Sequence, residues 1–577
     1  MSIRPELALL GISFGVLLGP RAGAQVPIFE LTGLAGSRTG EVIASMPDID
    51  GNGFDELLIG APDDSWGAPG AGRVFLLSGP VGGVQKTWFG TDDYARFGAA
   101  VACAGDVNLD GVADVIVGEP LGGFGRPGLA YVFSGYSGQL LHTLFGPGMA
   151  VEGFGSSVAG AGDVNGDGHD DVVVGAPGSL LSSPGSASVY SGADGALLHR
   201  FYGTSNSRLG ASVAGAGDLD GDGFDDILVG TPQWGVQPRL WVGSVSAYSG
   251  RDGTLLYRVE GTSAMDRLGT AVASVGDLDG DGIQDVLAGA PQTSTIGSAV
   301  GMVSVLSGAT GQLIRTLHGN PGYELFGSAL SGAGDLDLDG VDDLIVGVGD
   351  TPANAGLRAG RVRLISGASG HLLHELDAPL SGDGFGLALA EIGDLDGDGV
   401  PEVIVGDPLA SGSGAASGRV RVYSGSDLRP GRPLCAGAIG AGCPCGNPTA
   451  NGSGCANGTG SGAHLAAFGV PDISLDVVVL RAGGIPPLMP GIFLGGRPRT
   501  TGLPLGNGLL CLRGGQTRLE VIRADGSGQA VSSTSLSQAE GLGGGEVRGY
   551  QLVYRDSMAS GACTATFNVS SGVVLTW

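Results

Sequence analysis

Acidic segments of nine residues recur along the chain and place oxygen-bearing side chains at alternate positions. The copy at Asp218 reads DLDGDGFDD, with carboxylates at its first, third, fifth and ninth positions and glycine at its sixth. Alternate residues of a tight hairpin point the same way, and glycine accepts the sharp turn between them. Several hard oxygen ligands on one side of a turn suit Ca²⁺ better than Zn²⁺ or copper. The pattern therefore predicts a calcium-binding loop.

An ordinary turn rich in Asp and Gly is the alternative for any single copy. Copies begin, however, at Asp48, Asp106, Asp163, Asp218, Asp277, Asp335 and Asp394, which are 55 to 59 residues apart. A simple turn needs one or two such residues, and clustering three or four carboxylates in it adds repulsion without benefit. The recurrence favours cation binding, and up to seven structural Ca²⁺ ions are predicted.

Each loop is predicted to hold its cation through positions 1, 3, 5, 7 and 9, with position 7 contributing its backbone carbonyl. The predicted ligands are Asp48, Asp50, Asn52, Phe54 and Glu56; Asp106, Asn108, Asp110, Val112 and Asp114; Asp163, Asn165, Asp167, His169 and Asp171; Asp218, Asp220, Asp222, Phe224 and Asp226; Asp277, Asp279, Asp281, Ile283 and Asp285; Asp335, Asp337, Asp339, Val341 and Asp343; and Asp394, Asp396, Asp398, Val400 and Glu402. The eighth residue, Asp225 in the fourth loop, is not predicted to be a ligand. The expected affinity is modest, on the order of 10⁻⁴ to 10⁻³ M, as in extracellular modules.

Four short apolar segments separated by glycine turns make up each repeat, and they must position the loop. A segment opening with Phe-Gly or Leu-Gly precedes the loop, and a segment such as ILVGTP (Ile227–Pro232) follows it. Four short strands per repeat are typical of a β-propeller blade. The seventh repeat lacks its fourth segment, and residues 26–33 (VPIFELTG) are predicted to supply it, which hides the sheet edges. The predicted fold is all-β: a seven-bladed propeller followed by a small β-sandwich-like C-terminal module.

These repeats resemble the FG-GAP repeats of the integrin-alpha-type propeller. The third repeat carries both parts of the motif, Phe154-Gly155 and Gly175–Pro177. The resemblance covers residues 26–430 and implies calcium-binding loops of nine residues between two strands of a blade, together with a role in extracellular adhesion. Thr39 replaces the expected Phe in the first repeat, and Gly347–Gly349 replaces the proline-bearing turn in the sixth, so these two blades are expected to be less regular.

The two ends of the chain indicate export. Arg4 precedes an apolar stretch, and Ala22–Ala24 reads as a cleavage site, so residues 1–24 are predicted to be a signal peptide. The propeller is predicted to span 25–430 and the C-terminal module 431–577, and no later apolar segment is long enough to span a membrane.

Six of the seven cysteines lie in the C-terminal module, and this even number predicts up to three disulfides. The module resembles a cysteine-containing module of exported bacterial proteins. Cys103 is expected to be a buried strand residue. The predicted location is secreted or cell surface.

The net charge of −28 argues against a nucleic-acid partner and against anionic lipid. No GxSxG, HExxH or Walker pattern occurs, so catalysis is not predicted. Instead, the variable loops carry aromatic residues that either contact a partner or fold over their own blade: Trp66, Tyr94, Phe124, Trp234, Trp241 and Tyr323. The predicted function is adhesion to, or recognition of, an extracellular protein or glycan, with calcium in a structural role. The alternatives are a lectin-like carbohydrate binder and a secreted polysaccharide-active enzyme.

Overall fold

The computed structural model describes residues 13–16, 27–79, 83–122, 128–147, 152–178, 184–235, 241–294, 300–320, 324–337, 339–349, 360–378, 380, 382–395, 399–428, 432–434, 464–468, 479–483, 488–505, 508–524, 530–532, 547–555 and 567–576. These residues form two compact units, with the main boundary between Ser424 and Gly425. Strands dominate both units, and the short α2 (Gly425–Leu428) is the single helix of the described part. No helix of that part has the length and apolar character needed to cross a membrane.

The first unit contains seven antiparallel sheets of four strands, with a fifth strand on one of them. The first three blades contain β3 (Val42–Met46), β4 (Glu56–Ala61), β5 (Arg73–Ser78) and β6 (Gly83–Phe89); β7 (Ala100–Gly105), β8 (Asp114–Glu119), β9 (Leu129–Phe133) and β10 (Leu140–Phe145); and β11 (Ser157–Gly162), β12 (Asp171–Ala176), β13 (Ser186–Tyr190) and β14 (Leu197–Tyr202).

The next three blades repeat this order. They contain β15 (Ser212–Gly217), β16 (Asp226–Thr231), β17 (Ser244–Tyr248) and β18 (Leu255–Glu260); β19 (Val272–Val275), β20 (Asp285–Ala290), β21 (Met302–Leu306) and β22 (Leu313–His318); and β23 (Phe326–Gly332), β24 (Leu344–Val348), β25 (Arg361–Ile365) and β26 (Leu372–Asp377). The seventh blade contains β27 (Ala388–Ile392), β28 (Glu402–Asp407) and β29 (Arg419–Tyr423), and its other strands come from the start of the chain.

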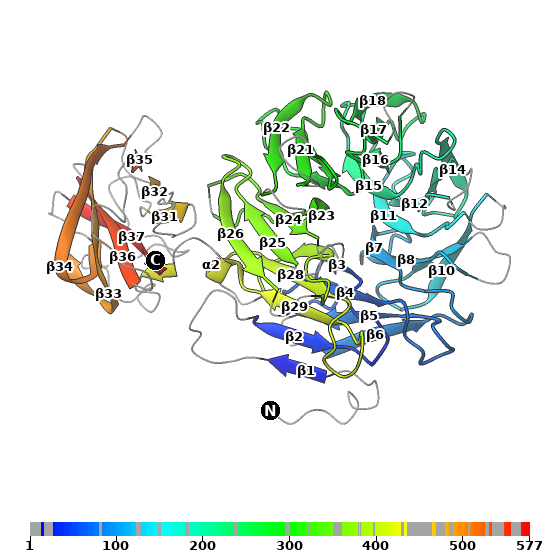
Figure 1. The fold of residues 1–577 in the computed structure, drawn as a ribbon, viewed down its shortest axis with the longest axis horizontal. Helices are drawn as coiled ribbons and strands as arrows, with labels where there is room; N and C mark the ends of the chain where they lie inside the picture. The colour runs from blue at the N-terminus through cyan, green and yellow to red at the C-terminus, as the bar shows by residue number, and fades with distance from the viewer. Residues whose placement is uncertain are drawn as a thin grey trace. The chain divides into compact units, whose positions relative to one another are not determined.

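The blades form a closed ring (Figure 1). The first strands of successive blades contact one another in order from β3 to β27, and β27 contacts β3. The second strand of each blade is buried along its whole length, as in β16. Its apolar side chains pack against the neighbouring blades, so each core cluster is built from two blades. The predicted seven-bladed propeller is confirmed.

Ring closure uses the strand that the sequence predicts. β2 (Phe29–Thr32) pairs antiparallel with β29, with Glu30 opposite Arg421, and thereby completes the seventh blade. β1 (Ser13–Val16) pairs with the outer side of β2, and it lies in the segment that the sequence predicts to be removed on export. That removal stays a prediction.

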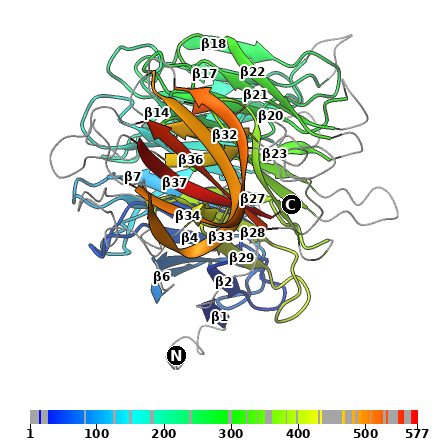
Figure 2. The same cartoon turned by 90° about the vertical axis from the view of Figure 1, so that its left-hand side faces the viewer.

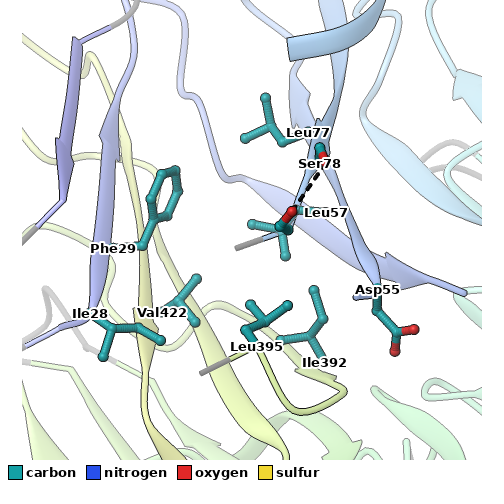
Figure 3. Close-up of a pocket in the computed structure, with 10 residues that line it drawn as sticks. Ile28, Phe29, Asp55, Leu57, Leu77, Ser78, Ile392, Leu395 and Val422 are labelled. Carbon is teal, nitrogen blue, oxygen red and sulfur yellow. Dashed lines mark hydrogen bonds between the residues drawn. The ribbon is translucent and has the colours of Figure 1, made fainter. Parts of the chain in front are cut away.

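A small apolar cavity marks the seam between the seventh and first blades (Figure 3). Phe29, Val422 and Ile392 line it from the seventh blade, and Leu57 and Leu77 line it from the first. Its volume of about 20 Å³ leaves room for about one water molecule. The cavity is therefore a packing feature of the closure and has no room for a substrate.

The glycines of the FG-GAP motif lie where blades meet. A Cβ on Gly230 of β16 would approach the carbonyl oxygen of Gly269, which belongs to the next blade, to 2.3 Å. Gly269 has a φ of +82°, a conformation that favours glycine. The same contact closes the ring, because a Cβ on Gly406 would meet the carbonyl oxygen of Gly40 at 2.2 Å. Both glycines are therefore required by the close approach of adjacent backbones.

Of the two blades expected to be irregular, only the sixth is. β24 has five residues where the corresponding strands have six, and its register shift with β23 lies between Phe326 and Leu330, near the start of β23, whereas the shifts in the second, third and fourth blades lie at the end of the first strand. In the first blade, β3 pairs with β4 without a shift. Thr39 is buried there and bridges to Gly418, just as Phe97 bridges to Gly72. The expectation of irregularity was wrong for the first blade, because a buried threonine fills the position of the phenylalanine.

The second unit contains two sheets. Its strands are β30 (Arg432–Leu434), β37 (Phe567–Thr576), β36 (Val547–Arg555), β33 (Pro490–Leu505) and β34 (Gly508–Arg523) in one sheet, and β31 (His464–Phe468), β32 (Val479–Gly483) and β35 (Ala530–Val531) in the other. Leu465 and Leu480 from the smaller sheet share one core with Phe493 and Tyr550 from the larger. Figure 2 shows the long, curved β33 and β34 of this unit.

Candidate metal centres

Each acidic loop connects the first and second strands of its blade, and its first residue organises the turn. In the fourth loop, Asp218 Oδ1 accepts hydrogen bonds from the backbone N–H groups of Gly221 and Asp222, at 2.7 and 3.0 Å. Asp218 Oδ2 accepts a bond from the N–H of Gly223, at 2.9 Å. Gly221 and Gly223 both have positive φ, and a Cβ at either would meet open space. These glycines are therefore required by the backbone conformation alone.

The ninth residue connects the loop to the rest of the blade. Asp226 Oδ2 accepts a hydrogen bond from the N–H of Leu219, the second loop residue, at 2.8 Å. Asp226 Oδ1 accepts one from the N–H of Gly250, in the Ser-Gly turn between the third and fourth strands, at 3.0 Å. A Cβ on Gly250 would lie 1.8 Å from the carbonyl oxygen of Asp225. The Ser-Gly turn therefore lies against the acidic loop, and its glycine belongs to the site although the sequence analysis did not include it.

The structure brings predicted ligands together in four loops. Three carboxylates lie close enough to share one ion in the groups Asp48, Asp50 and Glu56; Asp218, Asp220 and Asp226; Asp277, Asp279 and Asp285; and Asp335, Asp337 and Asp339. Among the described residues, the second and third loops do not gather three carboxylates in this way. Their third positions are Asn108 and Asn165, which offer an amide oxygen in place of a carboxylate. In the seventh loop, 396–398 lie outside the described residues.

Burial and mutual repulsion act on the ninth carboxylate. Burial raises the pKa of Asp226 to about 6. Backbone hydrogen bonds lower this pKa, whereas repulsion from Asp220 and Asp218 raises it. Burial also raises the pKa of Asp171 to about 7 and that of Asp343 to about 8, the latter with repulsion from Asp337. At the loop surface the direction reverses, because the N–H of Gly282 and its neighbours lower the pKa of Asp277.

These carboxylates fit a bound cation. An opposite charge nearby strongly stabilises the charged form of a buried carboxylate that faces two others. Each oxygen of Asp226 accepts one hydrogen bond from the backbone, at 2.8 and 3.0 Å, and a carboxylate oxygen has a second lone pair for a metal. The donors are all hard oxygens, which suits Ca²⁺.

The eighth residue of the acidic loop, which is not predicted to be a ligand, connects neighbouring blades. Asp225 Oδ2 accepts a hydrogen bond at 2.9 Å from the N–H of Asp163, the first residue of the preceding loop. In return, the N–H of Asp225 donates to the carbonyl oxygen of Asp163 at 3.3 Å. Asp170 forms the same pair of bonds with Asp106. We call this two-bond contact the interblade clamp, and it ties one metal loop to the next.

Breaking the clamp should destabilise the ring. Asp225→Ala removes the acceptor for the Asp163 N–H and leaves that partly buried donor unpaired, so we expect a loss of about 1 to 2 kcal/mol in the free energy of unfolding. Differential scanning calorimetry of the variant measures the effect. Asp225→Asn is the control, because it keeps an acceptor oxygen and should lose much less. An unchanged melting temperature for Asp225→Ala would contradict a stabilising role for the clamp.

Histidines of the fourth strands and of the loops also face neighbouring blades. His142 Nε2 lies 2.6 Å from the carbonyl oxygen of Gly192, and His199 Nε2 lies 2.6 Å from that of Gly250. Arg315 occupies the same repeat position and donates to the carbonyl oxygen of Gly367 at 2.7 Å. The imidazole of His169, whose predicted contribution is its carbonyl, contacts Val107 of the preceding loop at 2.8 Å.

The predicted partner residues differ in exposure. Tyr94 is 70% exposed, Trp66 is 52% exposed and Trp241 is 36% exposed. Trp234 is half-buried, with the guanidinium of Arg258 4.4 Å from its ring centroid and its Nε1 donating to Glu260 at 3.1 Å. Phe124 and Tyr323 lie outside the described residues.

The structure describes the side chain of Cys103 but leaves most cysteines of the C-terminal module out. Cys435, Cys443, Cys445, Cys455 and Cys563 lie outside the described residues. Cys103 is half-buried in β7 and carries a free thiol, whose pKa is raised by burial.

Comparison with known repeats agrees with this architecture. The model of the FG-GAP repeat matches residues 39–77, 154–191, 209–251 and 268–306. These segments fall in the first, third, fourth and fifth blades, and each contains an acidic loop. The chain contains FG-GAP repeats, and the resemblance noted from the sequence is confirmed.

Relatives of two kinds are similar to part of this chain. The chain is 33% identical to integrin alpha-V of Gallus gallus over 216 residues, which are 35% of this chain and 20% of the integrin. It is 31% identical to integrin alpha-4 of Xenopus laevis over 255 residues, 41% of this chain and 24% of that protein. It is 28% identical to phosphatidylinositol-glycan-specific phospholipase D of Bos taurus over 392 residues, 56% of this chain and 45% of that protein. The chain thus spans a quarter or less of these integrins and under half of the phospholipase.

Proposed function

We propose that this protein is an exported recognition module whose propeller is stabilised by Ca²⁺ and binds an extracellular protein or glycan. The observation that carries the proposal is the gathering of buried ninth carboxylates with other acids in the loops, as at Asp218, Asp220 and Asp226. Clustered carboxylates attract cations and repel anionic partners, so a bound cation is the best explanation for them. The location outside the cell, the signal peptide at 1–24 and the disulfides of the C-terminal module are part of this proposal.

Calcium would be held by the side chains at positions 1, 3, 5 and 9 and the carbonyl at position 7 of each loop, for example Asp218, Asp220, Asp222, Asp226 and Phe224. When bound, the ion neutralises the mutual repulsion of these carboxylates. The Asp226 carboxylate also accepts a hydrogen bond from the N–H of Gly250 in the Ser-Gly turn. An ion that neutralises this carboxylate therefore stabilises both strand connections on this face of the blade. The role of calcium is therefore structural.

Recognition is assigned to the opposite face. Strands alternate in direction, so the connections between the second and third strands lie at the other edge of each blade from the acidic loops. This face presents Trp66, Tyr94 and Trp241, which are exposed. Large aromatic side chains on the surface are typical contact residues for proteins and sugars. The similarity to integrin alpha chains supports the proposal, because the FG-GAP resemblance implies a role in extracellular adhesion.

A glycan and protein array probed with the full chain, with and without calcium, tests the proposal. We expect binding to at least one extracellular ligand class, which is lost in Trp241→Ala and retained in Tyr136→Ala. Tyr136→Ala is the matched control, because Tyr136 is an exposed aromatic residue in the turn between β9 and β10, on the face of the acidic loops. Absence of binding on every array would contradict recognition as the function.

Catalysis is the competing proposal, and one comparison favours it. The similarity to the phosphatidylinositol-glycan-specific phospholipase D covers more of this chain than the similarity to either integrin. The acids of the described propeller are, however, largely used within the loops, in the interblade clamp and in ion pairs. Turnover of a glycosylphosphatidylinositol substrate or a polysaccharide by the purified chain would favour the enzyme.

A further inference from the structure

Arginines occupy one repeat position in four blades, immediately before the first residue of the FG motif, which is Phe, Leu or, in the first blade, Thr. They are Arg38, Arg96, Arg208 and Arg267. All four have positive φ, between 51° and 60°, so their backbones leave the loop in the same way. They fall into two pairs from adjacent blades: Arg38 with Arg96, and Arg208 with Arg267. The two pairs can therefore be compared position by position.

The first pair is neutralised by two acids of the first blade. Arg96 pairs with Glu41 and, through Nε, with Asp63 at 3.1 Å. Arg38 pairs with the same two acids, at 3.4 Å to Glu41 and 3.1 Å to Asp63. Two guanidinium groups thus enclose two carboxylates, and this contact raises the pKa of Arg96 against the effect of burial.

The second pair has no such acids. Ala211 follows the motif glycine where Glu41 stands in the first blade, and Gln233 takes the place of Asp63. Backbone contacts confirm the second equivalence, because the N–H of Asp63 donates to Ser37 and the N–H of Gln233 donates to Ser207. The site therefore keeps its arginines and lacks the carboxylates that would neutralise them.

No described residue compensates for this loss. The Nε atoms of Arg208 and Arg267 are buried and have no hydrogen-bond partner. Burial lowers the pKa of Arg267, and the like charge of Arg208 lowers it further. The acids nearest in sequence are bonded elsewhere: Glu260 to Trp234, and Asp266 to the N–H of Ser263 at 2.7 Å.

An indole lies beside the open pair. The N–H of Arg267 donates to the carbonyl oxygen of Trp241, and the Arg267 guanidinium lies 5.6 Å from the centroid of the Trp241 ring. In the first blade the corresponding backbone bond joins Arg96 to Gly70, which has no side chain. Trp241 is 36% exposed, so it presents a flat apolar surface next to the Arg267 guanidinium.

We propose that Arg208, Arg267 and Trp241 form a subsite for a carboxylated sugar, a uronate residue of an extracellular glycan. The ligand carboxylate takes the place that Glu41 and Asp63 hold in the first pair, where it accepts hydrogen bonds from both guanidinium groups. The sugar ring places its C–H face against the indole. A uronate carries both features in one residue, whereas an acidic peptide supplies the carboxylate without a ring. This inference rests on the proposed recognition function and names its ligand class.

Isothermal titration of the full chain with oligogalacturonate tests the subsite. We expect saturable binding that weakens with salt and is absent for the methyl-esterified oligosaccharide, which keeps the ring and loses the charge. Arg267→Gln and Arg208→Gln should each weaken binding at least tenfold. Arg38→Gln is the matched control: it removes an arginine from the neutralised pair and should leave the affinity unchanged.

A second variant protects the test against misfolding. The double variant Gln233→Asp and Ala211→Glu places at the open pair the two acids that the first blade has. The fold already accommodates these acids beside the arginine pair of the first blade. We expect it to fold and to lose oligogalacturonate binding. Unchanged affinity in this variant or in Arg267→Gln would overturn the subsite, and binding of poly-glutamate without binding of oligogalacturonate would overturn its ligand class. Binding of other array ligands with no uronate binding would overturn this inference and leave the proposed function standing.

Discussion

Removing calcium at pH 8 is expected to lower the melting temperature of the protein by on the order of 10 °C, and to lower it far less at pH 5. At a free concentration about tenfold above Kd, each ion adds about 1.4 kcal/mol to the free energy of unfolding. Several occupied loops together contribute about 5 to 10 kcal/mol, which corresponds to a shift of that order in a domain of this size. Calorimetry with calcium and with a chelator, at both pH values, measures it.

The direction of the pH effect follows from the ninth carboxylates. In the metal-free fold their pKa values are raised, to about 6 for Asp226 and Asp285 and about 7 for Glu56. The unfolded chain has its ordinary values near 4. Between these values the folded state binds more protons, so the stability of the metal-free protein is full below pH 4 and falls as the pH rises through 6 to 7. Calcium needs the ionised form, so its contribution grows over the same range.

Asp226→Asn serves as the matched variant for one loop. It removes the charge at the ninth position and keeps an acceptor for the N–H of Leu219 or Gly250. The metal-free variant should therefore melt no lower than the metal-free parent at pH 8, while its gain from calcium is smaller by one site. Equal losses on chelation at pH 5 and pH 8, or no loss at either, would contradict the structural role of calcium.

The repeat in the sequence was sufficient to predict the blades, their number and the closure. Regular spacing of the acidic loops sets the phase, and a missing fourth strand at one end is matched by VPIFELTG at the other. Both are local patterns that any four-stranded blade must satisfy. The pairing of Phe29–Thr32 with β29 follows from them directly.

Contacts between blades could not be predicted from those patterns. Asp225 looks like one more acid of its loop, and only the packing of adjacent blades places its carboxylate against the N–H of Asp163. Gly250 reads as an ordinary turn glycine, yet it is fixed by the carbonyl of Asp225 and by the Asp226 carboxylate. The open arginine pair likewise depends on which side chains the neighbouring blade brings to it. Such contacts join residues 24 to 62 positions apart, so no local spacing records them.

The closing seam should be the other place where one substitution has a large effect. Arg421 of β29 is almost fully buried, and its Nη1 lies 2.5 Å from Oδ2 of the buried Asp407. Its Nε bonds Glu30 of β2 at 3.2 Å, so this arginine connects the borrowed strand to the rest of the blade. Arg421→Met leaves the Asp407 charge buried without a partner, which typically costs about 3 to 5 kcal/mol.

We therefore expect Arg421→Met to lower the melting temperature by several degrees and to speed hydrogen exchange in β2 and β29 before the other blades. Arg419→Met is the control, because the ion pair of Arg419 is with the partly exposed Glu30, at 3.5 Å, and Arg419 attracts Asp407 less strongly than Arg421 does; its loss should cost about 1 kcal/mol or less. Adding Asp407→Asn to Arg421→Met should recover much of the stability, since the uncompensated charge is then gone. If Arg421→Met proves no worse than Arg419→Met, the buried pair does not hold the ring closed, and the pairing of β2 with β29 together with the apolar packing of Phe29 and Val422 must suffice.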